Sequence, residues 1–128
     1  MELGARLAEA LTAVIPVEVE PDGALTLRYE GTFASLRTVT IADDIEIISV
    51  TQVLAWDLPV NADLRKRVAA LAQSTMLGTV TFAEQSGKRG DVMLRYNFPG
   101  EGLTEGALQT LVLMVLAGGA DARRALVD

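Results

Sequence analysis

The sequence of 128 residues contains no cysteine and no histidine. Without cysteine the chain has no disulfide, no thiolate zinc site and no cysteine nucleophile. Without histidine it lacks the commonest general base and a favoured transition-metal ligand. Catalysis would have to use Ser, Thr, Tyr, Lys or carboxylate side chains, and neither a G-x-S-x-G elbow nor an S-x-x-K motif is present. We therefore expect a protein that is not an enzyme and that holds no metal or other cofactor.

Long apolar runs and positive charge are also scarce. The most apolar stretch, residues 111–120, is well short of the ~20 residues that span a bilayer. The first twenty residues carry Glu2 and Glu9 and lack the basic and apolar regions of a secretory signal. With 11 basic and 17 acidic residues the net charge is −6, so nucleic-acid phosphates would be repelled. We expect a cytoplasmic protein that binds neither membranes nor nucleic acid.

The length and composition indicate one globular domain over residues 1–128. Half of the residues are hydrophobic and 22% are charged, which is typical of a folded domain of this size. Apolar residues at helical spacing, with Pro16 and Gly78 as stop signals, predict helices at 2–14, 62–76 and 105–126. Alternating apolar and polar residues predict strands at 16–20, 24–30, 34–41, 45–56, 79–84 and 91–98. The resulting order, α-β-β-β-β-α-β-β-α, predicts an α+β fold in which helices pack on a mainly antiparallel sheet.

Apolar side chains are more abundant than one small monomer needs. Residues 45–56 are apolar on both alternating faces, which predicts a strand covered on both sides by helices of this chain or by a second subunit. The last helix is apolar nearly all round through 111–117, and the mean hydropathy is +0.31. A homodimer interface would bury such an excess. The residues expected on this partner or dimer surface are Ile48, Val50, Trp56, Val112 and Leu116.

The segment QSGKRGDV, residues 85–92, contains fragments of two functional motifs. Gly87-Lys88 resembles the end of a phosphate-binding loop, but Phe82 and Arg89 stand where that loop needs glycine and Ser or Thr. Arg89-Gly90-Asp91 matches an adhesion tripeptide, although nothing in the chain indicates export. Because two alternating strands flank the segment, we interpret it as the bend of a β-hairpin.

Two other groups of residues are open to a functional reading. The adjacent carboxylates Asp43 and Asp44 could bind a hard cation, but they lie between two predicted strands and are typical of a turn. Trp56, the only tryptophan, could line a pocket or a partner groove. Core packing is favoured for Trp56 because it continues the alternation of Ile48, Val50 and Leu54.

The C-terminal half of the chain resembles a known fold. Residues 57–126 contain a short helix, a glycine, a hairpin whose second strand reads DVMLRYNFP, a cap at Gly102-Leu103-Thr104 and a long closing helix. In this order they are similar to bacterial YbjN-type domains and to the type III secretion chaperone-like fold. The resemblance implies a dimerising module with chaperone or regulatory roles, and it transfers no catalytic site.

Three hypotheses about function follow from the sequence. The first is a non-enzymatic homodimeric protein-interaction module, chaperone-like or a regulatory adaptor, that holds a partner segment on its sheet or helix surface. The second is a small-molecule-binding regulator with a pocket near Trp56. The third is a carboxylate-dependent metalloenzyme that uses Asp43 and Asp44.

Overall fold

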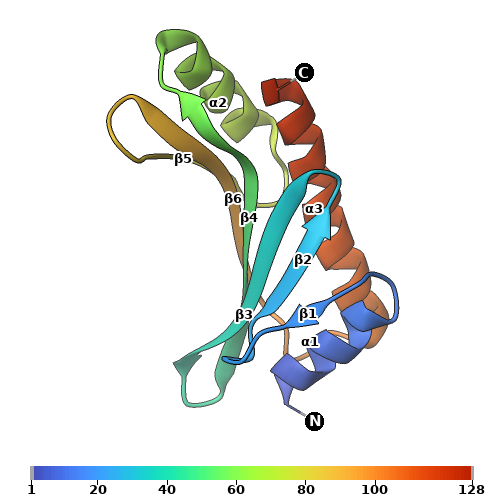
Figure 1. The fold of residues 1–128 in the computed structure, drawn as a ribbon. Helices are drawn as coiled ribbons and strands as arrows, with labels where there is room; N and C mark the ends of the chain where they lie inside the picture. Colours follow the sequence, from blue (N-terminus) through green and yellow to red (C-terminus); the bar gives the residue numbers. More distant parts are fainter. Residues whose placement is uncertain (1, 128) are drawn as a thin grey trace.

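A computed structural model of the protein describes residues 2–127. It has the predicted α+β fold with the elements in the predicted order (Figure 1). The helices are α1 (Leu3–Thr12), α2 (Ala62–Ser74) and α3 (Glu105–Val127). The strands are β1 (Glu18–Val19), β2 (Leu25–Tyr29), β3 (Thr32–Ala42), β4 (Ile45–Pro59), β5 (Thr79–Glu84) and β6 (Arg89–Pro99).

The six strands form one antiparallel sheet in the order β1-β2-β3-β4-β6-β5. β4, the longest strand with 15 residues, lies inside the sheet between β3 and β6. β5 and β6 pair as the predicted hairpin, with Glu84 opposite Gly90, so the segment 85–88 is the bend between them. Arg89, Gly90 and Asp91 are the first residues of β6.

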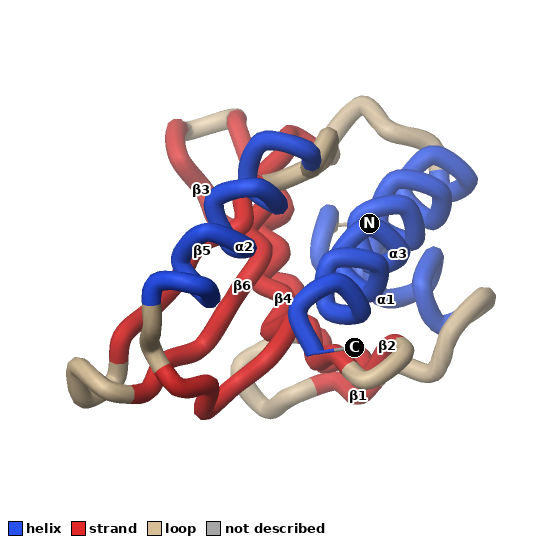
Figure 2. The backbone as a smooth tube through the Cα atoms, turned by 90° about the horizontal axis from the view of Figure 1, so that it is seen from above, coloured by secondary structure: helices blue, strands red, loops and turns tan. Residues whose placement is uncertain are grey.

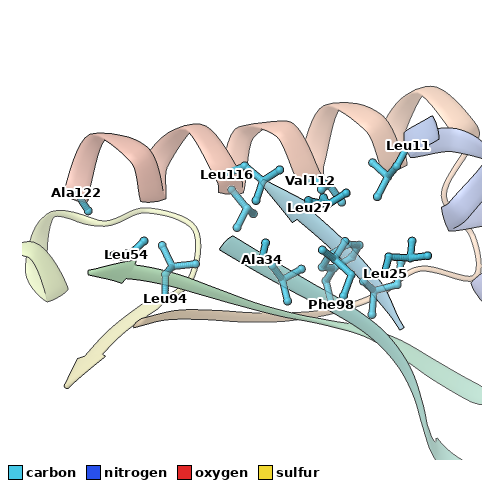
Figure 3. Close-up of a cluster of buried hydrophobic side chains, with 14 of the residues drawn as sticks. Leu11, Leu25, Leu27, Ala34, Leu54, Leu94, Phe98, Val112, Leu116 and Ala122 are labelled. Atoms are coloured by element: carbon cyan, nitrogen blue, oxygen red, sulfur yellow. The ribbon is translucent and has the colours of Figure 1, made fainter. Parts of the chain in front are cut away.

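The helices pack on one face of the sheet. Viewed from above, α1 and α3 lie in contact with each other on the same side of the sheet (Figure 2). Alternate strand residues such as Leu36, Val50 and Leu94 meet the apolar sides of the helices in one buried cluster, part of which is drawn in Figure 3. The opposite face, on which Ser35, Thr51 and Arg95 lie in register, is covered by no helix within residues 2–127. The prediction allowed the two sides of β4 to be covered by helices of this chain or by a second subunit, and the helices of this chain cover one side only.

Local signals in the sequence set the starts of two helices. The Asn61 side chain caps α2, because its Oδ1 accepts a hydrogen bond from the Leu64 N–H at 2.8 Å. The Thr104 hydroxyl accepts from the Ala107 N–H at 3.1 Å at the start of α3. α2 ends earlier than predicted, because Thr75 already has extended backbone angles. Met76 therefore leaves the helix and its side chain points to solvent, with an exposed fraction of 88%.

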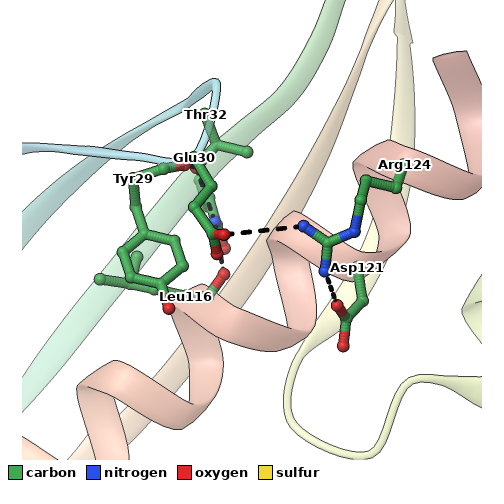
Figure 4. A network of polar contacts seen from close by, with 7 residues as sticks. Tyr29, Glu30, Thr32, Leu116, Asp121 and Arg124 are labelled. Atoms are coloured by element: carbon green, nitrogen blue, oxygen red, sulfur yellow. Dashed lines mark hydrogen bonds and ion pairs between the residues drawn. The ribbon is translucent and has the colours of Figure 1, made fainter. Parts of the chain in front are cut away.

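A buried glutamine joins α3 to the sheet. Gln52 of β4 is fully buried, and its amide nitrogen donates to the Thr32 hydroxyl at 2.9 Å and to the Leu116 carbonyl at 3.1 Å. The Thr32 hydroxyl in turn donates to the Tyr29 carbonyl at 2.6 Å, as part of the network in Figure 4. A side chain is excluded from Gly119, because a Cβ there would overlap the Gln52 amide. Gly119 thus permits the close approach of α3 to β4.

We expect replacement of this glycine to be costly. The substitution Gly119→Ala should lower the free energy of unfolding by about 1–3 kcal/mol, the usual cost of overpacking a dense core. Gly118→Ala is the matched control, because a Cβ there meets nothing within 4 Å, and it should stabilise the helix by roughly 0.5–1 kcal/mol. Urea denaturation of both variants measures the difference. Equal stability of the two variants would contradict the proposed close contact, and Gln52→Ala should partly rescue Gly119→Ala.

Candidate functional site

Four of the five residues predicted for a partner surface lie in the core of the single chain. Ile48, Val50, Val112 and Leu116 each have an exposed fraction of 0%, so their assignment to a partner or dimer surface is wrong. The reason is that α3 crosses the sheet, and the apolar sides of the helix and of β4 cover each other (Figure 3). Only the fifth residue, Trp56, is on the surface.

Trp56 is 47% exposed and does not continue the buried alternation of β4. The pairing of β4 with β6 shifts between Val53 and Ala55, so that strand alternation changes there. The Trp56 ring instead lies 5.6 Å from the ring of Phe33, centroid to centroid. Phe33 pairs with Val53 in the register of β3 and β4, on the face of the sheet that carries no helix. The prediction that Trp56 belongs to the core is therefore wrong.

Two arginines flank this aromatic pair. The Arg28 guanidinium carbon lies 4.5 Å from the centroid of Phe33, and that of Arg123 lies 5.5 Å from the Trp56 ring. Cations at such distances are attracted to the ring faces. Arg28, Phe33, Trp56 and Arg123 form what we call the aromatic–arginine site. They come from β2, β3, β4 and α3, and so are far apart in the sequence.

Arg123 reaches this site from the helix side of the sheet. Its guanidinium donates to the Leu54 carbonyl at 2.7 Å, while its side chain passes the turn between β2 and β3. At that turn Gly31 has a φ of +85°, a conformation that favours glycine. A Cβ on Gly31 would also stand 2.8 Å from Arg123 Nε. Gly31 therefore provides both the backbone conformation of the turn and the space that the Arg123 side chain occupies.

A hollow of about 480 Å³ lies against the aromatic–arginine site. The hollow is lined by the four residues of the site and by four residues at the β2–β3 turn: Tyr29, Glu30, Gly31 and Thr32. The carboxylate of Glu30 is 3.9 Å from Arg124 of α3 (Figure 4), so this acid is directed to a cation outside the site. The hollow thus combines an aromatic wall with two guanidinium groups.

The helix-free face of the sheet continues from this site across the strands. We call it the open face, and its register rows are rich in hydroxyl and apolar side chains. One row runs through Thr26, Ser35, Thr51, Arg95 and Thr79. Its neighbour runs through Arg28, Phe33, Val53, Met93 and Thr81. The third arginine of the open face, Arg37, pairs with Asp22 at 2.8 Å.

A second surface feature lies between α2 and α3. A hollow of about 300 Å³ there is lined by Leu71, Met76, Leu77 and Met114 among others. Met76 and Met114 are 88% and 53% exposed, so two large apolar side chains border the hollow. We call this region the α2–α3 patch. No motif in the sequence marks it, and Met76 falls within the helix predicted over residues 62–76.

The acidic residues do not gather into a metal site in the part of the chain that the structure describes. Asp43 and Asp44 occupy the exposed turn between β3 and β4, and residues 2–127 contain no group of three or more Asp, Glu, His or Cys that could hold an ion. Across the same residues, none of the helices is both long and apolar enough to cross a membrane.

One carboxyl has a shifted pKa: partial loss of water and the nearby charge of Glu101 raise the pKa of Glu46.

The raised pKa of Glu46 predicts a pH-dependent effect. A carboxyl whose pKa is higher in the folded chain favours folding below its ordinary pKa and loses that benefit as the pH rises through the raised value. Glu46→Gln should therefore be slightly more stable than the wild type at pH 7, and this advantage should disappear below about pH 4. Urea denaturation at both pH values, with Glu9→Gln as the control, tests this. An advantage that is the same at both pH values would contradict it.

Comparisons with protein-family models and with curated proteins find no match to this chain.

Proposed function

We propose that the chain is a homodimeric protein-interaction module without catalytic activity. The observation that carries the proposal is the outward face of α3, which is exposed yet uncharged along most of its length. Between Glu105 and Asp121 the helix contains no Asp, Glu, Lys or Arg. A helix that faces water usually carries charged or polar residues on its outer side.

The residues on this outer face follow a helical spacing of four. Gly106, Thr110, Met114 and Gly118 are all exposed, and residues four apart lie on one side of a helix. The stripe they form is roughly 18 Å long at 1.5 Å per residue. Its small residues leave room for another helix to approach closely. It continues into the α2–α3 patch, since Met114 and Gly118 line the hollow there.

We propose that a second copy of the chain covers the α2–α3 patch. Met76 projects into solvent beside the hollow that it lines. In a two-fold symmetric dimer the same patch of both subunits meets, so each projecting side chain faces the other subunit's hollow. The apolar lining from Leu71, Leu77 and Met114 suits a methionine, whose flexible side chain fills irregular spaces. These features favour a second copy as the occupant.

Such a dimer would leave the open face free for a partner protein. Arg28, Arg37 and Arg95 place guanidinium groups on this face, of which Arg37 is paired with Asp22, although the whole chain has a net charge of −6. Strand spacings put these cations roughly 12–16 Å apart, too far for one small anion. We therefore propose that the partner is an extended segment with several acidic side chains. The role is that of a chaperone-like or regulatory adaptor.

The order of elements supports a relationship with bacterial YbjN-type domains and the type III secretion chaperone-like fold. The hairpin of β5 and β6 followed by the capped α3 is the part of the chain that carried the resemblance. We propose membership in this group on that ground. A dimeric adaptor would agree with what the resemblance implies.

A single charge in the patch should separate the subunits. We expect the wild type to sediment at twice its 13.6 kDa mass, and Met114→Glu to weaken dimerisation at least tenfold, because the carboxylate would be buried without a partner. Analytical ultracentrifugation over a range of concentrations measures both. The matched control is Ile41→Glu, which changes a 60% exposed apolar residue on the β3–β4 hairpin. A monomeric wild type at several hundred micromolar would overturn the dimer.

Partner binding can be tested by capture from cells of the source organism with three forms of the tagged protein as bait. The proposal predicts one protein at fixed stoichiometry with the wild-type bait. Thr51→Glu, in the centre of the open face, should abolish its capture, and Ala70→Glu on the exposed side of α2 should leave it unchanged. Capture that survives Thr51→Glu would mean that the open face is not the docking surface.

A second candidate function, a small-molecule-binding regulator, is favoured by the hollow of about 480 Å³ beside Trp56. Its volume lies within the range of small-molecule sites, about 300–1,000 Å³. This function leaves the proposed dimer surface unchanged, because the hollow and the α2–α3 patch have no lining residue in common, but it shares Arg28 and Phe33 with the open face.

A further inference from the structure

We infer that the aromatic–arginine site binds a small planar aromatic carboxylate. The inference rests on the second candidate function and adds the chemical class of the ligand. It combines three properties of the site: an exposed aromatic wall, two guanidinium groups and a hollow of limited size.

The aromatic wall is available for contact with a flat ring. The Trp56 side chain is 47% exposed and its ring is tilted by 57° to that of Phe33. An offset or tilted aromatic pair can accept a third ring at its free face or edge, because such arrangements are the preferred ones between aromatic groups. A large exposed aromatic side chain is otherwise unfavourable on a surface, and a ligand ring would shield it from water.

The cations supply the recognition of charge. Arg123 already uses one guanidinium nitrogen on the Leu54 carbonyl, which fixes the position of the group. Arg28 contacts the face of Phe33, and within residues 2–127 its guanidinium makes no hydrogen bond or ion pair. A guanidinium stacked on a ring keeps its N–H groups free at its edge, in a geometry that matches a carboxylate.

The surroundings favour a single anionic group. The one acid in the wall, Glu30, lies near Arg124 on the helix side. Two arginines at a hollow are an unusual concentration of positive charge in a chain with a net charge of −6. The hollow of about 480 Å³ would hold a ligand of one or two fused rings, with its carboxylate directed at Arg28.

The sole tryptophan makes the experiment specific. We would titrate the ¹⁵N-labelled full chain with 2-naphthoate and with its neutral amide, 2-naphthamide, and follow the single Trp56 indole N–H resonance. The inference predicts a saturable shift with naphthoate, and an affinity for the amide that is at least tenfold lower. Arg28→Gln should lower the naphthoate affinity at least tenfold. Arg37→Gln, an arginine on the same face but outside the hollow, should leave it unchanged.

The outcomes separate the inference from the function on which it rests. Equal binding of naphthoate and naphthamide would overturn the carboxylate preference and leave a neutral-ligand site at Trp56. No shift with either compound would overturn the inference, because no aromatic ring would then bind beside Trp56. Equal naphthoate binding by the wild type and by Arg28→Gln, with unchanged melting temperatures, would contradict the role of Arg28. Met114→Glu should bind naphthoate normally, so failure of the dimer would not be mistaken for failure of this site.

Discussion

The contact between Gln52 and Gly119 determines how α3 lies on the sheet. The Gln52 amide is fully buried and donates to Thr32 and to the Leu116 carbonyl, so it joins the β2–β3 hairpin, β4 and the helix. Burying an amide is unfavourable unless it is hydrogen-bonded, and the bond to the Leu116 carbonyl forms only when the helix is close enough, while the Gln52 amide oxygen accepts no hydrogen bond within residues 2–127. Glycine at position 119 permits that distance. Because the contact fixes one side of α3 against the sheet, it also fixes which residues of the helix face outward.

The aromatic–arginine site and the α2–α3 patch both depend on how α3 is rotated about its own axis. Arg123, one turn after Gly119, is directed past Gly31 to the Leu54 carbonyl and to Trp56. Met114 lies on the opposite side and lines the α2–α3 patch. A helix rotated by one residue position, roughly 100°, would withdraw Arg123 from the aromatic pair and turn Met114 toward the sheet.

The sequence predicted all nine elements, because each depends on local alternation, helical spacing or a capping residue such as Asn61. The prediction was wrong where a strand or helix departs from the regular spacing of its side chains. The shift in β4 after Val53 reverses the side on which Trp56 lies, and no residue type in that stretch marks the irregularity. The early end of α2 at Ser74 likewise exposes Met76. The aromatic–arginine site could not be predicted, since it joins residues from four elements. The close approach at Gly119 could not be predicted either, because it depends on where the fold places the Gln52 side chain.

The high mean hydropathy of the chain did not identify the partner surface, because many of its large apolar side chains are buried in the core of the single chain. Ile48, Val50, Val112 and Leu116 lie on the sides of β4 and α3 that face each other, and for that reason they are buried in the core of the single chain. The large apolar side chains that remain exposed include Met76 after the end of α2, Met114 on the outer side of α3 and Trp56 after the irregularity in β4, and also Ile41 and Ile45 at the β3–β4 hairpin. In this domain the strongest apolar pattern therefore marks the core, and the candidate binding residues are those that the same elements leave exposed, such as Met114 on the outer side of α3.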